Sequence, residues 1–385
     1  MISTSQIPIS IYVHIPWCER KCPYCDFNSH EGFQAQFESQ YIDSLVLDLQ
    51  SQRPWVNDRM VSSVFIGGGT PSLFSGESIA TLLSKMSMLV QLQKDAEVTL
   101  ECNPSSAVNN RFIDYRRAGV NRLSIGVQSF NAKSLKSLGR LHSPKDAKKA
   151  LSFADSAGFD RWNIDLMHGL PGQTAESALE DLEQAFALVN GHLSWYQLTI
   201  ERNTRFWSSR PILPTEEMLA STQERGELLL RSASLEQYEV SAFATPGQEC
   251  HHNLNYWNFG DYLGIGAGAH GKISSPNGSV IRTYRTRAPD KYISQMLQNP
   301  SAMPANQWIK GDELTAEFMM NALRLKKGCS LDAFERHTGL SLEQLDESCI
   351  EAVHRGWLYP PLESGRIATT PLGYQFLDSV VALFL

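Results

Sequence analysis

Long apolar segments and repeated cysteine pairs are missing from this 385-residue sequence. No apolar run is long enough to span a bilayer. The first ten residues do not combine a charged start with a long apolar stretch, so we expect no secretory signal. The seven cysteines cluster only once, which argues against a disulfide framework and favours the reducing cytoplasm.

Excess positive charge is missing as well. The formal net charge is −7, which argues against extended binding of nucleic acid. With 42% hydrophobic and 19% charged residues, the composition is typical of a globular protein. The length allows one large domain and a smaller one.

The single cysteine cluster is the most informative feature of the sequence. Cys18, Cys22 and Cys25 have C-x3-C-x2-C spacing and follow an apolar, strand-like run over residues 9–16. Three thiolates on one loop can hold three irons of a four-iron cluster, and the fourth iron then stays open to a small molecule. A zinc site with His14 or His30 as fourth ligand is an alternative, as are thiols without a function.

Strand-like and helix-like segments alternate through the first 200 residues. We expect strands over residues 9–14, 63–66, 97–101, 122–127, 163–167 and 194–200, and helices over 37–50, 79–90, 110–118, 145–157 and 175–189. Thr174 is the expected N-cap of the last helix, with Ser177 where a capping box prefers Glu. Because parallel neighbours need crossover helices, six strand–helix repeats indicate a parallel sheet.

Glycines and polar side chains gather at or just after the expected strands. They are Gly67-Gly68-Gly69-Thr70-Pro71, Glu101, Gln128, Arg140 and Asp165. Their spread over several loops favours a βα barrel, since a doubly wound sheet would concentrate them at one switch point. Each alone could be a tight turn, a cap or an ion pair at the rim. Together they could bind a zwitterionic ligand, with Arg140 on its carboxylate.

The pattern changes after residue 200. We expect a helix over 216–235 and a short strand near 238–242, and Pro and Asn near 299–306 mark a linker. From residue 305 the chain is predicted to form helices and a final strand pair at 356–358 and 366–368, which is winged-helix-like. Seven Lys and Arg against eleven Asp and Glu argue against DNA binding there. The expected domain limits are 1–240, 241–304 and 305–385.

Several motifs together resemble the radical S-adenosylmethionine superfamily. The cysteine loop reads Tyr12-x-His14-Ile15-Pro16-Trp17-Cys18-x3-Cys22-x2-Cys25, and the other motifs are GGGTP at 67–71, GVQSF at 126–130, LGR at 138–140, DLMHGLP at 165–171 and HNLNYW at 252–257. Within the superfamily, the set is similar to the oxygen-independent coproporphyrinogen dehydrogenase group, and most similar to the haem chaperones of that group. The resemblance implies an α/β fold: an incomplete (β/α)6 radical-SAM barrel with a smaller, helical, winged-helix-like C-terminal domain.

The resemblance also implies cofactors and the residues that hold them. Cys18, Cys22 and Cys25 would ligate a [4Fe–4S] cluster, whose open iron would be chelated by S-adenosylmethionine. The positions that would hold S-adenosylmethionine are Tyr12, Gly68, Gly69, Thr70, Glu101, Gln128, Arg140 and Asp165. In active members one electron from the cluster cleaves the sulfonium, while the protein positions the cofactor and excludes water and oxygen.

The last motif, HNxxYW, points to haem. A neutral imidazole is a common axial ligand of haem iron, and His252 is the candidate, with His251 and Cys250 as competitors. Tyr256 and Trp257 could stack on the macrocycle. From the residues alone, His252 and Trp257 could equally be core residues with satisfied partners.

Three arginines, at 282, 285 and 287, recur along a strand-like run. They could bind the propionates of haem, or they could form a solvated strand face.

Two departures separate the chain from the dehydrogenases. Dehydrogenases carry one more cysteine two residues after the third, where this chain has Phe27. They also have a long N-terminal arm, which we do not expect here because only eleven residues precede Tyr12. We therefore expect a haem chaperone without dehydrogenase activity, which binds haem and transfers it to an acceptor haemoprotein such as a respiratory enzyme. The alternative is oxidative decarboxylation of coproporphyrinogen III by a deoxyadenosyl radical.

The resemblance also implies partners and a location. We expect a haem-donor protein, no nucleic acid, and a homodimer that forms when cluster and cofactor are bound. The expected location is the cytoplasm, with peripheral contact at the inner face of the membrane.

Overall fold

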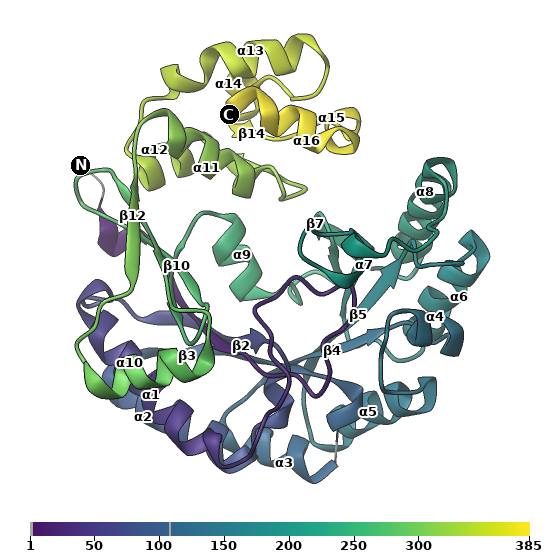
Figure 1. Cartoon of the computed structure of the whole chain (residues 1–385). Helices are drawn as coiled ribbons and strands as arrows, with labels where there is room; N and C mark the ends of the chain where they lie inside the picture. Colours follow the sequence, from purple (N-terminus) through teal and green to yellow (C-terminus); the bar gives the residue numbers. More distant parts are fainter. Residues whose placement is uncertain (1–2, 108) are drawn as a thin grey trace.

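A twelve-stranded mixed sheet dominates the protein (Figure 1). The structure is a computed structural model that describes residues 3–107 and 109–385. The strand order is β12-β11-β10-β9-β1-β2-β3-β4-β5-β6-β8-β7. Figure 1 shows the C-terminal helices, in yellow, gathered apart from the helices that cover the sheet.

The central strands β1 to β6 are parallel and lie in chain order. They are β1 (Ile9–Ile15), β2 (Val61–Gly68), β3 (Leu92–Cys102), β4 (Arg122–Gln128), β5 (Arg161–His168) and β6 (His192–Gln197). The helices between them are α1 (Phe37–Gln52), α2 (Gly76–Leu89), α3 (Asn109–Ala118), α4 (Ala132–Ser137), α5 (Pro144–Ser156) and α6 (Ala175–Phe186). Within the described residues β1 and β6 do not pair, so the arc stays open. The expected incomplete (β/α)6 barrel is confirmed, and its strand order has no reversal of the doubly wound kind.

Additional strands extend the sheet at both edges. β9 (Asp261–Ile265) pairs parallel with β1, and β10 (His270–Ser274), β11 (Val280–Tyr284) and β12 (Ala305–Ile309) continue antiparallel from it. At the other edge, β8 (Ala242–Ala244) and β7 (Glu236–Glu239) form a hairpin where one strand was expected. We expected the C-terminal domain from residue 305, but β12 belongs to the main sheet because it pairs with β11. The strand pairing does not test the division into 1–240, 241–304 and 305–385, so these domain limits stay a prediction.

The cap of α6 illustrates how the sequence sets a helix start. Thr174 Oγ1 accepts from the backbone N–H of Ser177, and Ser177 Oγ accepts from the N–H of Thr174 at 3.0 Å. Serine thus fills the capping-box position where glutamate is usual. The remaining helices before residue 300 are α7 (Arg205–Ser208), α8 (Glu216–Ser232), α9 (His251–Trp257) and α10 (Pro289–Gln298).

The C-terminal helices form their own core, which includes Phe318, Phe334 and Leu358. The elements are α11 (Asp312–Ala322), β13 (Cys329–Ser330), α12 (Leu331–Thr338), α13 (Asp346–His354), α14 (Pro361–Ser364), β14 (Arg366–Ile367), α15 (Pro371–Gln375) and α16 (Leu377–Val381). The expected strand pair at 356–358 and 366–368 is confirmed in part. Leu358 and Thr369 form an antiparallel bridge, in which the N–H of Tyr359 donates to Ala368 O at 3.1 Å and the N–H of Thr370 donates to Trp357 O at 2.9 Å. β14 itself pairs with β13.

In residues 3–107 and 109–385, no helix combines the length and the apolar character needed to cross a bilayer.

Candidate functional site

The three cysteines of the loop after β1 line a single cavity of about 360 Å³. All three are free thiols. Thr70 Oγ1 donates to Cys18 Sγ at 3.5 Å, and Arg140 Nη1 lies 3.9 Å from Cys22 Sγ. Burial raises the pKa of Cys18 and of Cys25, so a positive charge would be needed to stabilise the thiolates. Iron of a cluster supplies such a charge, and free thiols around one cavity fit that group.

The zinc alternative fits this loop less well. Across the described part of the chain, no three His, Cys, Asp or Glu side chains converge as the ligands of one ion would. The His14 ring bonds to Tyr12 Oη at 3.0 Å and to Asn28 O at 2.8 Å. The His30 ring lies 3.2 Å from Asn28 Oδ1. Both candidate fourth ligands therefore have other partners.

A fourth cysteine, Cys102 at the end of β3, lines the same cavity. Its Sγ donates to Leu100 O at 3.8 Å, and burial raises its pKa well above the ordinary range. A cluster ligand must be a thiolate, so the local environment disfavours this role.

Seven of the eight positions expected to hold S-adenosylmethionine line the cysteine cavity, namely Gly68, Gly69, Thr70, Glu101, Gln128, Arg140 and Asp165. Tyr12 lines a neighbouring cavity instead. Gly68 has φ of +115°, and a Cβ there would lie 2.6 Å from His14 Cε1, so the turn needs glycine. Gln128 ends β4 with φ of 69°, and its Oε1 accepts from Tyr196 Oη at 2.8 Å.

Two half-buried carboxyl groups face this cavity. Glu101 accepts from the N–H of Gly68 at 3.0 Å, and burial together with Asp165 raises its pKa to about 8. Burial also raises the pKa of Asp165, although Asn163 and Ser124 donate to it. A cationic ligand or hydroxyl donors would stabilise both groups in their ionised form.

Arg140 supplies the opposite charge. Its Nη2 donates to Gly126 O at 2.7 Å, while its Nε is buried and has no hydrogen-bond partner among the described residues. A buried donor without a partner fits an anionic group of a ligand. With the two carboxyl groups, the cavity thus presents both charges that a zwitterion needs.

The neighbouring cavity has a volume of about 670 Å³ and is lined by three histidines and several aromatic residues. Phe27, Gly68, Glu101, Asn253 and Trp257 line both cavities, so the two adjoin. Phe27, two residues after Cys25, is 58% exposed.

His252 reaches this second cavity from α9. Its Nδ1 lies 3.2 Å from Ser63 Oγ, and burial lowers its pKa to about 4, so the ring is neutral at pH 7. Ser63 engages one ring nitrogen, which leaves Nε2 as the nitrogen for a ligand. Its neighbours differ: His251 is exposed and lines neither cavity, and Cys250 is buried against Glu97.

Two residues of the second cavity have roles that the sequence did not single out. His270, at the start of β10, lines it and is a second imidazole for a ligand. The glycine-rich run before it was the only signal. Asn28 fixes the cysteine loop to this wall, because its Nδ2 donates to Ala267 O and to Arg287 O, both at 2.9 Å.

The three arginines of β11 and the following loop have separate roles. Arg285 is buried and forms an ion pair with Asp48, and Arg282 pairs with Glu317. Only Arg287 lines the second cavity. The interpretation as a solvated strand face is therefore wrong for Arg285, because strand partners and α1 enclose it.

A carboxylate of β3 fixes the start of α9. Glu97 accepts from the backbone N–H of His252 at 3.1 Å and of His251 at 3.2 Å. Arg161 pairs with it at 3.1 Å, and the distance to Arg122 is 3.9 Å. This arrangement satisfies N–H groups that the helix itself cannot, and it positions the helix that carries His252.

Another buried carboxylate holds the loop that follows Gln128. Asp181 of α6 accepts from Ser129 Oγ at 2.6 Å and from the N–H of Phe130 at 2.7 Å. Nothing in the sequence distinguished Asp181 from the other acids of its helix.

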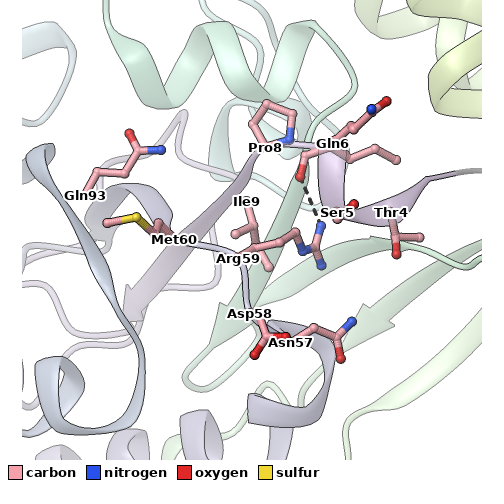
Figure 2. A pocket seen from close by; sticks show the side chains of 11 residues that line it. Thr4, Ser5, Gln6, Pro8, Ile9, Asn57, Asp58, Arg59, Met60 and Gln93 are labelled. Carbon is pink, nitrogen blue, oxygen red and sulfur yellow. Dashed lines mark hydrogen bonds between the residues drawn. The ribbon is translucent and has the colours of Figure 1, made fainter.

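A third cavity, of about 450 Å³, lies beyond the opposite end of β1 (Figure 2). Its one buried charge, Arg59, is fully paired, to Ile7 O at 3.2 Å, Trp55 O at 2.6 Å and Asp261 at 2.7 Å. The reactive side chains are gathered at the other end of the strands, as a βα barrel requires.

Comparison with protein families agrees with this geometry. Residues 12–185 match the model described as Radical SAM superfamily, and residues 309–376 match the HemN C-terminal domain. Among solved structures, coproporphyrinogen III oxidase (HemN) from Escherichia coli has the same fold. Its TM-score is 0.82 at 23% identity, and the alignment covers 99% of this chain and 90% of that one.

Relatives that align over nearly the whole chain are more similar in sequence than HemN is. The chain is 46% identical over 378 residues to the Escherichia coli (strain K12) protein named heme chaperone HemW, covering 98% of each chain. It is 44% identical over 383 residues to the Haemophilus influenzae protein of the same name, again covering 98% of each. The chain therefore belongs to the HemW family of the radical SAM superfamily. Membership of this superfamily implies a [4Fe–4S] cluster and S-adenosylmethionine.

Proposed function

We propose that this protein is a haem chaperone, which binds haem and transfers it to an acceptor haemoprotein such as a respiratory enzyme. The supporting observation is the second cavity, which brings a neutral imidazole and several aromatic side chains beside the cysteine cavity. His252 would be the axial ligand, and Tyr256 and Trp257 would contact the macrocycle. The names of the full-length relatives support the same proposal.

The cysteine cavity would hold the two other cofactors. Cys18, Cys22 and Cys25 would bind the cluster, and the seven further residues of that cavity, with Tyr12 from the adjoining one, would bind S-adenosylmethionine. Bound together, these groups can supply radical chemistry, and the chain's own part is to orient them and exclude water. We propose a cytoplasmic location with peripheral membrane contact, a haem-donor protein, no nucleic-acid partner, and a homodimer.

A turnover experiment separates this function from coproporphyrinogen III dehydrogenation. The protein is reconstituted anaerobically with iron and sulfide, then incubated with S-adenosylmethionine and coproporphyrinogen III. We expect no protoporphyrinogen, because Phe27 stands where the dehydrogenases carry a further cysteine. Protoporphyrinogen in catalytic amounts would contradict a chaperone without this activity.

Haem titration tests the proposed ligand. We expect His252→Ala to shift the Soret band and weaken haem binding by at least about tenfold, because an axial ligand is lost. The matched control is His251→Ala, since His251 is the adjacent, exposed histidine outside both cavities. If both variants bind haem as the wild type does, His252 is not the axial ligand. His270→Ala is then the next variant to titrate.

A further inference from the structure

An arginine of the C-terminal domain reaches the cysteine cavity. Arg324 follows α11 and lines this cavity together with Trp257 of α9. Its guanidinium lies over the indole of Trp257, 4.4 Å from the ring centroid. Two donors of this pair, Arg324 Nε and Trp257 Nε1, are buried and have no hydrogen-bond partner among the described residues. Buried donors in native proteins almost always have partners, and an acceptor on a ligand would satisfy this pair.

The backbone holds Arg324 in this place. Leu325, the next residue, forms a bridge with Glu239 of β7, and the N–H of Lys326 donates to Tyr238 O at 3.0 Å. The C-terminal domain is thus attached to the free edge of the sheet at the residues beside Arg324. The backbone that carries Arg324 is thus held beside the cavity.

The charges around Arg324 leave it open to an anion. None of the ion pairs within the described residues includes Arg324. Glu239 also lines the cavity, but it lies beyond ion-pair distance, and burial raises its pKa although Arg324 opposes this. Arg140, the other arginine of the cavity, lies by the cysteine loop and is expected to serve S-adenosylmethionine.

We propose that Arg324 and the Trp257 indole N–H bind a carboxylate of the porphyrin, that is, a propionate of haem. This inference rests on the proposed haem binding and adds a contact from the C-terminal domain. A guanidinium and a neighbouring N–H donor match the two oxygens of a carboxylate. Trp257 lines both cavities and Arg324 lines the cysteine cavity, so a carboxylate that reaches Arg324 would extend past the indole from the second cavity.

The test compares haem with its dimethyl ester, in which both propionates lack charge. Both are titrated into the full-length wild type and into Arg324→Met, which keeps an apolar stem and removes the donors. We expect the wild type to bind haem about tenfold or more tightly than the ester, and the variant to bind both alike. Trp257→Phe keeps an aromatic ring and removes Nε1, so this variant should lose part of the preference for haem over the ester.

Arg355→Met is the matched control. Arg355 also stacks on a tryptophan of the C-terminal domain, Trp357, at 4.9 Å, but lies outside both cavities. This variant should keep the wild-type preference. The proposal is overturned if Arg324→Met also binds haem more tightly than the ester to the same extent as the wild type. The proposed function fails separately, and the inference with it, if the wild type changes the Soret band of neither haem nor its ester.

Folding is checked by far-UV circular dichroism and thermal unfolding of each variant. Should Arg324→Met not fold, Arg324→Lys carries the test. Lysine keeps the charge but not the fork of donors, so an intermediate preference for haem is expected, and an unchanged preference would overturn the proposal.

Discussion

Replacing Glu97 with alanine tests whether the carboxylate at the start of α9 holds the site together. The Glu97 side chain is 1% exposed, and those of Arg122 and Arg161 are 2% and 22% exposed. Burial alone would raise the pKa of Glu97, but the two arginines outweigh it and hold the pKa below the ordinary value. The group is therefore ionised at pH 7, and its removal leaves Arg122 buried without a close counter-charge.

The size of the effect follows from this burial. Removing one partner of a buried ion pair typically costs about 3–5 kcal/mol, because the other charge is left uncompensated. The backbone N–H groups of His251 and His252 also lose their acceptor. We expect Glu97→Ala to lower the free energy of unfolding by about 3–5 kcal/mol. Glu97→Gln keeps the shape and one acceptor oxygen, so its loss should be smaller.

Urea unfolding followed by circular dichroism measures this loss. The matched control is Glu176→Ala, since Glu176 pairs with Arg225 at the same 3.1 Å as Glu97 with Arg161, but both partners are exposed. Exposed pairs contribute little, so the control should unfold as the wild type does. If Glu97→Ala also unfolds like the wild type, the reasoning about the buried carboxylate is refuted.

Two further predictions concern the loops around the cysteine cavity. After anaerobic reconstitution, Cys22→Ala should lose the iron–sulfur absorbance. Cys102→Ala, which changes a cysteine of the same cavity, should keep this absorbance. The reverse result would contradict the assignment of Cys22 as a cluster ligand. Burial raises the pKa of Asp181 to about 6, although Ser129 donates to it. The folded protein then binds this proton more readily than the unfolded chain, and stability falls as pH rises from about 4 to about 6. Relative to Asp181→Asn, the free energy of unfolding of the wild type should fall by on the order of 2–3 kcal/mol between about pH 4 and about pH 6. If the free energies of unfolding of the two proteins change in parallel with pH, the raised pKa of Asp181 is contradicted.

The order of elements in the barrel could be predicted because each strand and helix has its own local signal. The run before the cysteines and the Thr174 cap both lie where expected. The pairing of β14 with β13 could not be predicted in the same way. Arg366 and Ile367 pair with Cys329 and Ser330, almost forty residues earlier, and no local pattern encodes that choice of partner.

The same limit applies to the site. Spacing and motifs identified many of the side chains that line the cysteine cavity, because they lie in the loop after β1, at the ends of β2 to β5, or after α4. They could not distinguish Arg287, which lines the second cavity, from Arg285, which is buried against Asp48. Both arginines have the same local sequence character, and their difference arises from α1, which is far away in the chain. Long-range packing of this kind decides which polar residues are available to a ligand.

The parallel pairing of β1 with β9 affects how the protein is made. Ile9 pairs in register with Asp261, about 250 residues later, so β1 keeps an unpaired edge until most of the chain has left the ribosome. The contacts of Asn28 with Ala267 and Arg287 form later still. The cysteine loop is thus synthesised early, but these contacts cannot form until Ala267 and Arg287 have been made. Full enclosure of the cysteine thiols therefore waits for the second half of the chain.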